Sequence, residues 1–407
     1  MRSRHGFKLG AVLSGVLLVS GCGRSSGSQA LPSATPSAEA IAPASTAPLQ
    51  ADPKVAAGAR AYEHYCQLCH AKDATGYAAD NAPSLVTKTF LESASDEFIA
   101  AGIRMGRPGT AMAAYGKTRG GPLEEAEISA IVAFLRAKGP PRQPLPPSSV
   151  TGDAARGQAV FEKNCTSCHG TASTRGNSVH LHNPELLAAA SPAFLRYAVL
   201  HGRAPTPMPA FQGKLSEQEV TDVVSWLWSF KPAAPAAPVR DLTVPNDLPL
   251  VINPKGAHPK FTLRDDRFVS SEQVRKALAA KQRIVIVDAR PPSDWIQFRI
   301  PGAVSLPYHD HSQLERIPND GTWVVAYCAC PHHASGEVVD ALRRKNYKNT
   351  AVLDEGILFW RDKGFPLAGE AVTKPAGSAA PASSAAKAAK PAGSAAPASS
   401  AAKPAKP

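Results

Sequence analysis

The chain carries two copies of a Cys-x-x-Cys-His pentapeptide, Cys66–His70 and Cys165–His169. This spacing is typical of covalent haem attachment, in which two thiols add to the vinyl groups of one porphyrin edge and the adjacent histidine becomes the proximal iron ligand. A redox or zinc Cys-x-x-Cys is the alternative, but neither copy has the second Cys/His pair that a tetrahedral zinc site needs. The pattern therefore predicts two covalently bound haem c groups, held by Cys66, Cys69, Cys165 and Cys168, with His70 and His169 on the irons.

Each iron needs a sixth ligand or keeps an open position. Met112 and Met208 align in a shared Thr-x-Met-x-Ala-aromatic stretch, which resembles the axial-methionine loop of class I cytochromes c. The resemblance implies that these two methionines are axial ligands and that Met105 is a packing residue. A His/Met haem passes electrons and does little bond chemistry, so we expect electron carriers. Four histidines are alternative ligands, each expected instead at the surface or beside the haem propionates: His64, His180, His182 and His201.

The two motifs lie in matching surroundings. Each follows a predicted helix, at Gly58–Cys66 and Gly157–Cys165, and each half closes with an amphipathic helix. Ser216 is the predicted N-cap of the second closing helix. The halves therefore look like a duplicated all-α module.

A third candidate site follows the apolar run Thr322–Tyr327, a predicted buried strand. Further strands at Arg283–Asp288 and Thr350–Leu353 alternate with a helix at Gly336–Lys345. This alternation predicts an α/β domain with a parallel sheet and helices on its faces. Sites in such sheets lie at the carboxyl ends of strands, which is where Cys328 is placed.

Residues 263–370 resemble the rhodanese family. The matching motifs are Asp288-Ala289-Arg290, Asp294-Trp295, Ile300–Ala303, Asp354–Gly356 and Trp360–Pro366. Family members carry sulfane sulfur as a persulfide on the cysteine in the position of Cys328. The resemblance implies a sulfurtransferase or sulfur-compound oxidoreductase, in which backbone N–H groups and a helix N-terminus favour the thiolate.

The loop after Cys328 departs from the family pattern, in which Cys-x-x-Gly-x-Arg precedes Ser or Thr. Pro331 removes one N–H donor from the glycine position, and His333 makes the charge at the arginine position pH-dependent. Cys328, Cys330 and His333 are the candidate catalytic residues. Three interpretations remain open. Cys330 resolves a persulfide or sulfenate on Cys328 through an easily reduced disulfide; the two cysteines hold a soft metal such as copper with His332 and His333; or the domain is an idle docking module.

The N-terminus resembles a bacterial lipoprotein signal. A basic start precedes the apolar run Ala11–Ser20, which is too short to span a bilayer, and a lipobox-like Val19–Cys22 follows. The resemblance implies cleavage before Cys22 and lipidation of that residue, which would anchor the chain. An ordinary secretory signal with a stray cysteine is the alternative. We expect a lipid-anchored protein of the cell envelope that faces the periplasm or the exterior.

Low-complexity stretches rich in Pro, Ala and Ser divide the chain. The predicted segments are a signal peptide (1–21), a flexible tether (22–51), cytochrome c domains (52–138 and 152–230) separated by a Pro-rich linker (139–151), a second linker (231–262), a rhodanese-like domain (263–370) and a disordered Lys/Pro/Ala/Ser tail (371–407).

The net charge of +12 is concentrated in the signal and the tail, which is no nucleic-acid footprint. The haem motifs, the lipoprotein signal and the rhodanese resemblance lead us to expect other partners: periplasmic electron donor and acceptor proteins, the membrane through the N-terminal lipid, and a small sulfur compound.

Overall fold

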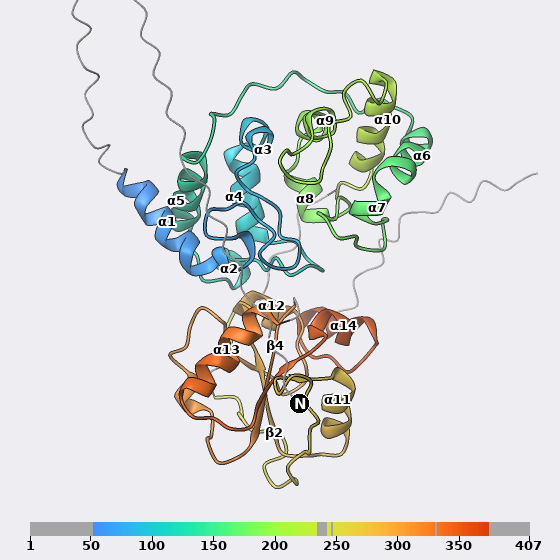
Figure 1. The fold of residues 1–407 in the computed structure, drawn as a ribbon. Coiled ribbons are helices and arrows are strands. Elements are labelled where there is room, and N and C mark those ends of the chain that lie inside the picture. Colours follow the sequence, from blue (N-terminus) through green and yellow to red (C-terminus); the bar gives the residue numbers. More distant parts are fainter. Residues whose placement is uncertain (1–51, 234–241, 246, 330–331, 374–407) are drawn as a thin grey trace, which may run out of the picture. The chain divides into compact units, whose positions relative to one another are not determined.

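The computed structural model describes residues 52–233, 242–245, 247–329 and 332–373 (Figure 1). All of these residues belong to one unit of the chain. The predicted signal peptide, Cys22, the tether and most of the tail lie outside the described residues. No helix within the described ranges is long and apolar enough to cross a membrane.

The first cysteine motif lies in a group of short helices. These are α1 (Pro53–Tyr65), α2 (Gln67–His70), α3 (Lys88–Ser93), α4 (Asp96–Met105), the 3-10 helix η1 (Lys117–Arg119) and α5 (Glu125–Arg136). The Asp52 carboxylate caps α1, and a capping box between Glu124 and Glu127 begins α5. The α1 and α5 helices cross at Gly58, where a Cβ would lie 1.9 Å from the carbonyl oxygen of Ala130. Glycine at position 58 therefore permits α1 and α5 to approach closely, and α1 leads directly into the first cysteine motif.

The second motif lies in a matching group of helices. These are α6 (Ala154–Asn164), α7 (Thr166–His169), α8 (Pro184–Ala189), α9 (Pro192–His201) and α10 (Glu217–Trp228). Ser216 caps α10 and forms a capping box with Glu219, which confirms the predicted N-cap. Gly157 lies at the crossing of α6 and α10, where a Cβ would be 2.1 Å from the carbonyl oxygen of Asp222. Each helical group therefore contains one helix crossing at which only glycine fits.

The two helical groups share one apolar core. The rings of Phe98 on α4 and Phe194 on α9 lie with centroids 4.4 Å apart. Thr89, at the start of α3, donates a hydrogen bond to the carbonyl of Gly202, directly after α9, at 2.7 Å and so also joins the two groups. In Figure 1 the helices α3, α4, α8 and α9 lie between the outer pairs α1/α5 and α6/α10.

The third part of the described chain is built around a five-stranded parallel sheet in the order β1-β5-β4-β2-β3. Its elements are β1 (Phe268–Val269), α11 (Ser271–Ala279), β2 (Ile284–Asp288), α12 (Pro292–Gln297), β3 (Val304–Ser305), η2 (Leu314–Arg316), β4 (Trp323–Tyr327), α13 (His333–Arg344), β5 (Thr350–Leu353), α14 (Gly356–Asp362) and α15 (Glu370–Thr373). The predicted fold class, an all-α region followed by an α/β domain with a parallel sheet, is confirmed. The two-residue strands β1 and β3 were not predicted.

Helices cover both faces of the sheet because its strands are apolar on both sides. Val285 and Val287 of β2 pack in the cluster that contains α13 residues. Ile284 and Ile286, which alternate with them, pack in the cluster that contains residues of α11 and α14. Figure 1 shows α13 on one side of β2 and β4 and the other two helices on the opposite side.

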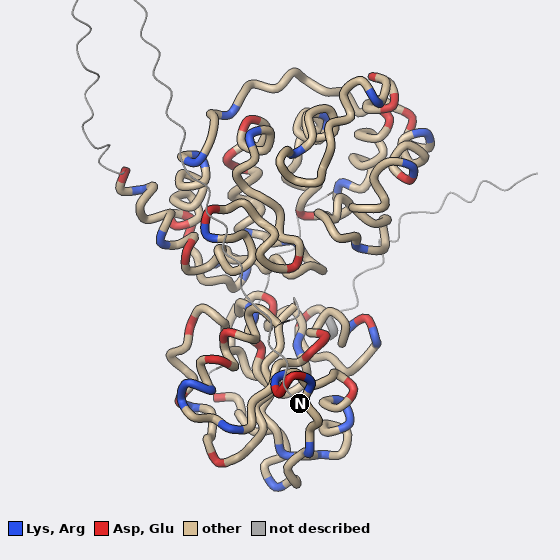
Figure 2. The backbone as a smooth tube through the Cα atoms, in the orientation of Figure 1, with Lys and Arg blue, Asp and Glu red and all other residues tan. Residues whose placement is uncertain are grey.

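Charged residues of both signs are interspersed over the helices and the sheet domain (Figure 2). Arg104 on α4, for example, bonds Glu125 at 2.7 Å and Glu97 at 3.0 Å. Exposed pairs of this kind contribute only about 0–1 kcal/mol each. Stability therefore comes mainly from the apolar clusters and the helix crossings.

Candidate functional site

Both Cys-x-x-Cys-His motifs form the same single turn. The N–H of Cys66 closes α1 on the carbonyl of Tyr62 at 2.8 Å, and the N–H of His70 donates to the carbonyl of Cys66 at 3.0 Å. In the second copy the N–H of Cys165 donates to Phe161 at 2.8 Å, and that of His169 donates to Cys165 at 3.0 Å. Each turn therefore places two thiols and one imidazole next to one another, as attachment to a single porphyrin edge requires.

The histidine of each turn is held in one orientation. His70 Nδ1 lies 2.9 Å from the carbonyl oxygen of Pro83, and His169 Nδ1 lies 2.7 Å from that of Val179. Because a carbonyl only accepts, Nδ1 carries the proton and Nε2 keeps its lone pair for a metal. Burial also lowers the pKa of both histidines, which favours the neutral form that a metal binds.

The candidate axial methionines lie in equivalent turns. The N–H of Arg107 donates to the carbonyl of Met112 at 2.7 Å, and the N–H of Arg203 donates to that of Met208 at 3.0 Å. The N–H of each methionine in turn donates to a threonine hydroxyl two residues earlier, at 3.1 and 3.4 Å. Met105 instead ends α4. The matching turns agree with the shared Thr-x-Met-x-Ala-aromatic stretch of the two halves. Axial ligation by Met112 and Met208 stays a prediction.

The four alternative histidines occupy different environments. His64 and His201 are exposed, and His180 is half-buried. His182 is not a surface residue: it is 7% exposed and packs against the rings of Phe161, Trp226 and Phe230. Burial, reinforced by nearby histidines, lowers the pKa of His182 to about 4. This side chain is therefore neutral at physiological pH and part of the core of the second helical group.

The residues around each motif suit a covalently attached haem. Burial raises the pKa of the Cys66 thiol to about 12 and that of the Cys165 thiol to about 11. Such surroundings disfavour a thiolate but suit an uncharged thioether. Together with the two Nε2 lone pairs and the two methionine turns, the donor set is the one that class I c-type haem takes.

Cys328 directly follows β4, at the carboxyl end of the sheet, and is 1% exposed. Its Sγ lies 3.3 Å from the hydroxyl of Ser335 in the first turn of α13. Its carbonyl accepts the N–H of Ile357 at 3.0 Å. Gly356 has φ +71°, and a Cβ there would lie 2.9 Å from the Cys328 carbonyl oxygen, so glycine is needed at that position. These contacts fix the cysteine from both sides.

His332 anchors the loop that leads into α13. It occupies the left-handed region with φ +83° and serves as N-cap residue, so α13 begins at His333. Its Nε2 donates to the Asp354 carboxylate at 2.8 Å. Its ring packs on that of Phe268, with 4.2 Å between the ring centroids. Hydrogen bonds from Arg264, and also from His332, hold the pKa of Asp354 below its usual value. The candidate residue Cys330 and its neighbour Pro331 lie outside the described residues.

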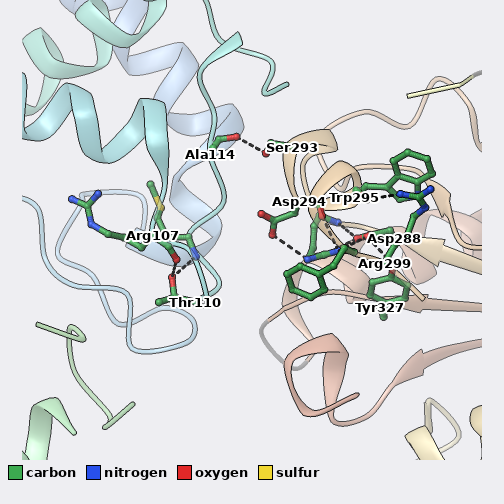
Figure 3. A network of polar contacts seen from close by, with 12 residues as sticks. Arg107, Thr110, Ala114, Asp288, Ser293, Asp294, Trp295, Arg299 and Tyr327 are labelled. Atoms are coloured by element: carbon green, nitrogen blue, oxygen red, sulfur yellow. Dashed lines mark hydrogen bonds and ion pairs between the residues drawn. The ribbon is translucent and has the colours of Figure 1, made fainter. Parts of the chain in front are cut away.

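A buried ionic network supports the end of β4, the strand that directly precedes Cys328 (Figure 3). Arg290 bonds both carboxylate oxygens of Asp288, at 2.9 and 2.7 Å, and Tyr327 donates to the same carboxylate at 2.8 Å. Burial, opposed by Arg290, raises the pKa of Asp294 to about 6. The Asp288-Ala289-Arg290 motif was noted in the sequence only as part of the rhodanese resemblance, and its role as a buried ion pair was not predicted. The signal was an ionisable motif at the end of an apolar strand, where burial demands pairing.

Two family descriptions match the chain. "Cytochrome C oxidase, cbb3-type, subunit III" matches residues 53–135 and 152–227, and "Rhodanese-like domain" matches residues 270–363. The chain is 32% identical over 208 residues to the cbb3-type cytochrome c oxidase subunit FixP of Bradyrhizobium sp. (strain ORS 278), across 47% of this chain and 67% of the relative. It is 31% identical over 100 residues to a sulfurtransferase of Allochromatium vinosum, across 24% of this chain and 92% of the relative.

Among solved structures, a rhodanese-related protein from Thermoplasma volcanium aligns at 20% identity with a TM-score of 0.23, over 26% of this chain and 99% of that chain. By the sequence relatives, the chain belongs to the cytochrome c family through its helical part and to the rhodanese family through its sheet domain. Membership of the cytochrome c family implies covalently bound haem c and redox partner proteins.

Proposed function

We propose that this protein is a lipid-anchored dihaem cytochrome c that transfers electrons outside the cytoplasm, and that its rhodanese-like domain handles sulfane sulfur at Cys328. The observation that carries the proposal is the pair of equivalent turns in which a histidine is locked through Nδ1 beside two cysteines. A chain with two such turns is suited to hold two haems in the same manner.

The cytochrome part rests on named residues. Cys66, Cys69, Cys165 and Cys168 would form the thioethers, His70 and His169 would bind the irons from one side, and Met112 and Met208 from the other. A c-type haem supplies reversible one-electron chemistry when bound. The protein fixes the tautomer of each histidine, keeps the sulfurs of Cys66 and Cys165 in buried surroundings and holds each methionine in a hydrogen-bonded turn.

The sulfur part rests on Cys328 and Ser335. In the proposed step the Cys328 thiolate attacks the terminal sulfur of a persulfide donor, R–S–S⁻. The S–S bond of the donor breaks, a new S–S bond forms on Cys328, and R–S⁻ leaves, so atoms and charge balance without any oxidant. The Ser335 hydroxyl, 3.3 Å from Sγ, and the N-terminus of α13 support the anionic sulfur.

The proposed location follows from the predicted signal, and the proposed partners follow from the haem motifs and the rhodanese-like domain. Lipidation of Cys22 would hold the chain at a membrane, with its domains in the periplasm or at the exterior. The partners would be periplasmic electron donor and acceptor proteins and a small sulfur compound. The domain boundaries given above belong to the same proposal.

A second candidate is that the rhodanese-like domain is a catalytically idle binding module. The observation that favours it is the hydrogen bonding of this domain to the helical part, for example Ser293 Oγ to the carbonyl of Ala114 at 2.6 Å. The copper alternative needs Cys330 beside Cys328, and Cys330 lies outside the described residues, so that alternative stays open.

Incubation of the purified protein with polysulfide, followed by mass spectrometry of its peptides, tests the two candidates. The sulfur proposal predicts one added sulfur atom on the peptide that contains Cys328. A Cys328→Ser variant should lose it, with an unchanged haem spectrum as the control. Absence of the added sulfur in the wild type would leave the binding-module candidate.

A further inference from the structure

The rhodanese-like domain lies directly against the first haem-attachment turn. The Tyr308 hydroxyl donates to the carbonyl of Tyr65, the residue before Cys66, at 2.6 Å. The same hydroxyl lies 2.9 Å from that of Tyr115. Ser293 Oγ donates to the neighbouring carbonyl of Ala114 (Figure 3). The domain therefore contacts both the chain that enters the cysteine turn and the chain that leaves the methionine turn.

Apolar contacts connect the same two turns to the cluster around Cys328. Leu68, in the middle of the first motif, and Ala111, next to Met112, are half-buried and pack against the cluster that includes Cys328 and Ala326. The first haem-attachment turn and the candidate sulfur site thus border one apolar cluster. Loss of Leu68 would expose part of this cluster to water.

The second attachment turn has a different environment. Ser167 and Cys168 are exposed, whereas the equivalent Leu68 and Cys69 are half-buried. From Thr166 to Ser178 the sequence is polar, and Arg175 is its one Lys, Arg, Asp or Glu residue. Arg175 pairs with Asp80 of the first helical group at 3.3 Å. The surface around the second turn is therefore polar and close to neutral.

We infer that the rhodanese-like domain is a built-in docking partner of the first attachment turn, and that an external redox protein with a polar, near-neutral contact face docks at the second turn, around Ser167 and Cys168. This inference rests on the proposed function, because it takes both turns to hold haem. Thioethers tie one porphyrin edge to the cysteines, so whatever covers the cysteines also restricts access to that edge. The first edge is committed to the internal partner, and the second is open to the external one.

Hydrogen exchange of the haem-loaded full-length protein tests the internal contact. The Leu68→Lys and Tyr308→Ala variants should exchange about tenfold faster in residues 108–116, because local opening becomes easier when the docking contacts are lost. Tyr308→Phe, which removes only the hydroxyl, provides a milder variant if the others fail to fold. Ser167→Lys is the matched control and should leave this segment unchanged. Unchanged exchange in all three docking variants would overturn the internal contact.

Electron exchange with an added small redox protein, followed by stopped-flow spectroscopy, tests the external surface. Ser167→Lys should slow this reaction, and Tyr308→Phe, which lies outside both attachment motifs, should not. The wild-type rate should change little with ionic strength, because the contact surface is near-neutral. A rate that responds to Tyr308→Phe and not to Ser167→Lys would overturn the assignment. Failure of the proposed function is distinguishable, because a protein without covalent haem retains no haem on the chain after denaturation.

Discussion

The helix crossings that position the haem-attachment turns can be tested by adding one methyl group at Gly58. In a Gly58→Ala variant the new carbon would lie 1.9 Å from the carbonyl oxygen of Ala130 and 2.4 Å from its carbonyl carbon. Ordinary contact begins at 3.4 Å. Both contacted atoms belong to the α5 backbone, so α1 and α5 must separate by about 1.5 Å (3.4 minus 1.9). Helix α1 leads into the first motif and α5 closes its module, so the strain falls at the proposed first haem site.

The added methyl group has two opposing effects on stability, so the sign of the net change tests whether α1 and α5 cross at Gly58. Alanine stabilises an unstrained helix interior by about 1 kcal/mol relative to glycine. Overpacking costs about 1–3 kcal/mol, and the cost rises when backbone must move. We therefore expect the free energy of unfolding to fall by about 2 kcal/mol in Gly58→Ala, measured by urea unfolding with far-ultraviolet circular dichroism.

Gly102→Ala is the matched control for this experiment. Gly102 also lies inside a helix, but a Cβ there meets only the end of the Arg107 side chain, at 3.0 Å, and that side chain can move. This control should be as stable as the wild type or more stable. A Gly58→Ala protein that gains stability in the same way would refute the proposed crossing geometry.

Three further predictions concern the sheet domain and its contact with the helices. Arg290→Leu leaves the fully buried Asp288 carboxylate without its ion partner, and urea unfolding followed by tryptophan fluorescence should show a loss of about 3–5 kcal/mol; a loss below about 1 kcal/mol would contradict the buried pair. Burial lowers the pKa of His309 to about 4, against about 6.5 when unfolded, so the unfolded chain binds more protons below pH 6.5 and the free energy of unfolding should fall by about 2 kcal/mol between pH 6.5 and 4. His309→Gln should remove that part of the pH dependence, and an unaltered dependence would count against it. Ser335→Ala removes the hydroxyl 3.3 Å from Cys328 Sγ, so alkylation of the thiol at neutral pH should slow roughly tenfold; equal rates would exclude a supporting role for the serine.

The architecture was largely predictable because its signals are local. Ser216 three residues before Glu219 specifies a capping box, and the structure has that box at the start of α10. The predicted strand Thr350–Leu353 is β5 with the same bounds. Two-residue strands such as β3 carry too few residues for a period-2 pattern, so they leave no comparable signal.

Contacts between distant segments were not predictable in the same way. The pairing of Phe98 with Phe194 joins α4 and α9, two helices far apart in the sequence that the sequence patterns did not identify. The contacts of Tyr308 with Tyr65 and Tyr115 also depend on how modules dock, which no local pattern encodes. The burial of His182 was missed for a related reason, since the rings around it come from distant segments: Phe161 lies on α6, Trp226 on α10 and Phe230 just after α10.

The central claim is that two haems are covalently bound, one at each cysteine turn. Mass spectrometry of the intact mature chain, denatured and washed with acidified acetone, tests it most directly. The wild type should retain the mass of two haems, and the paired variants Cys66→Ser/Cys69→Ser and Cys165→Ser/Cys168→Ser should each retain one. A washed wild-type chain that retains no haem mass would contradict this expectation.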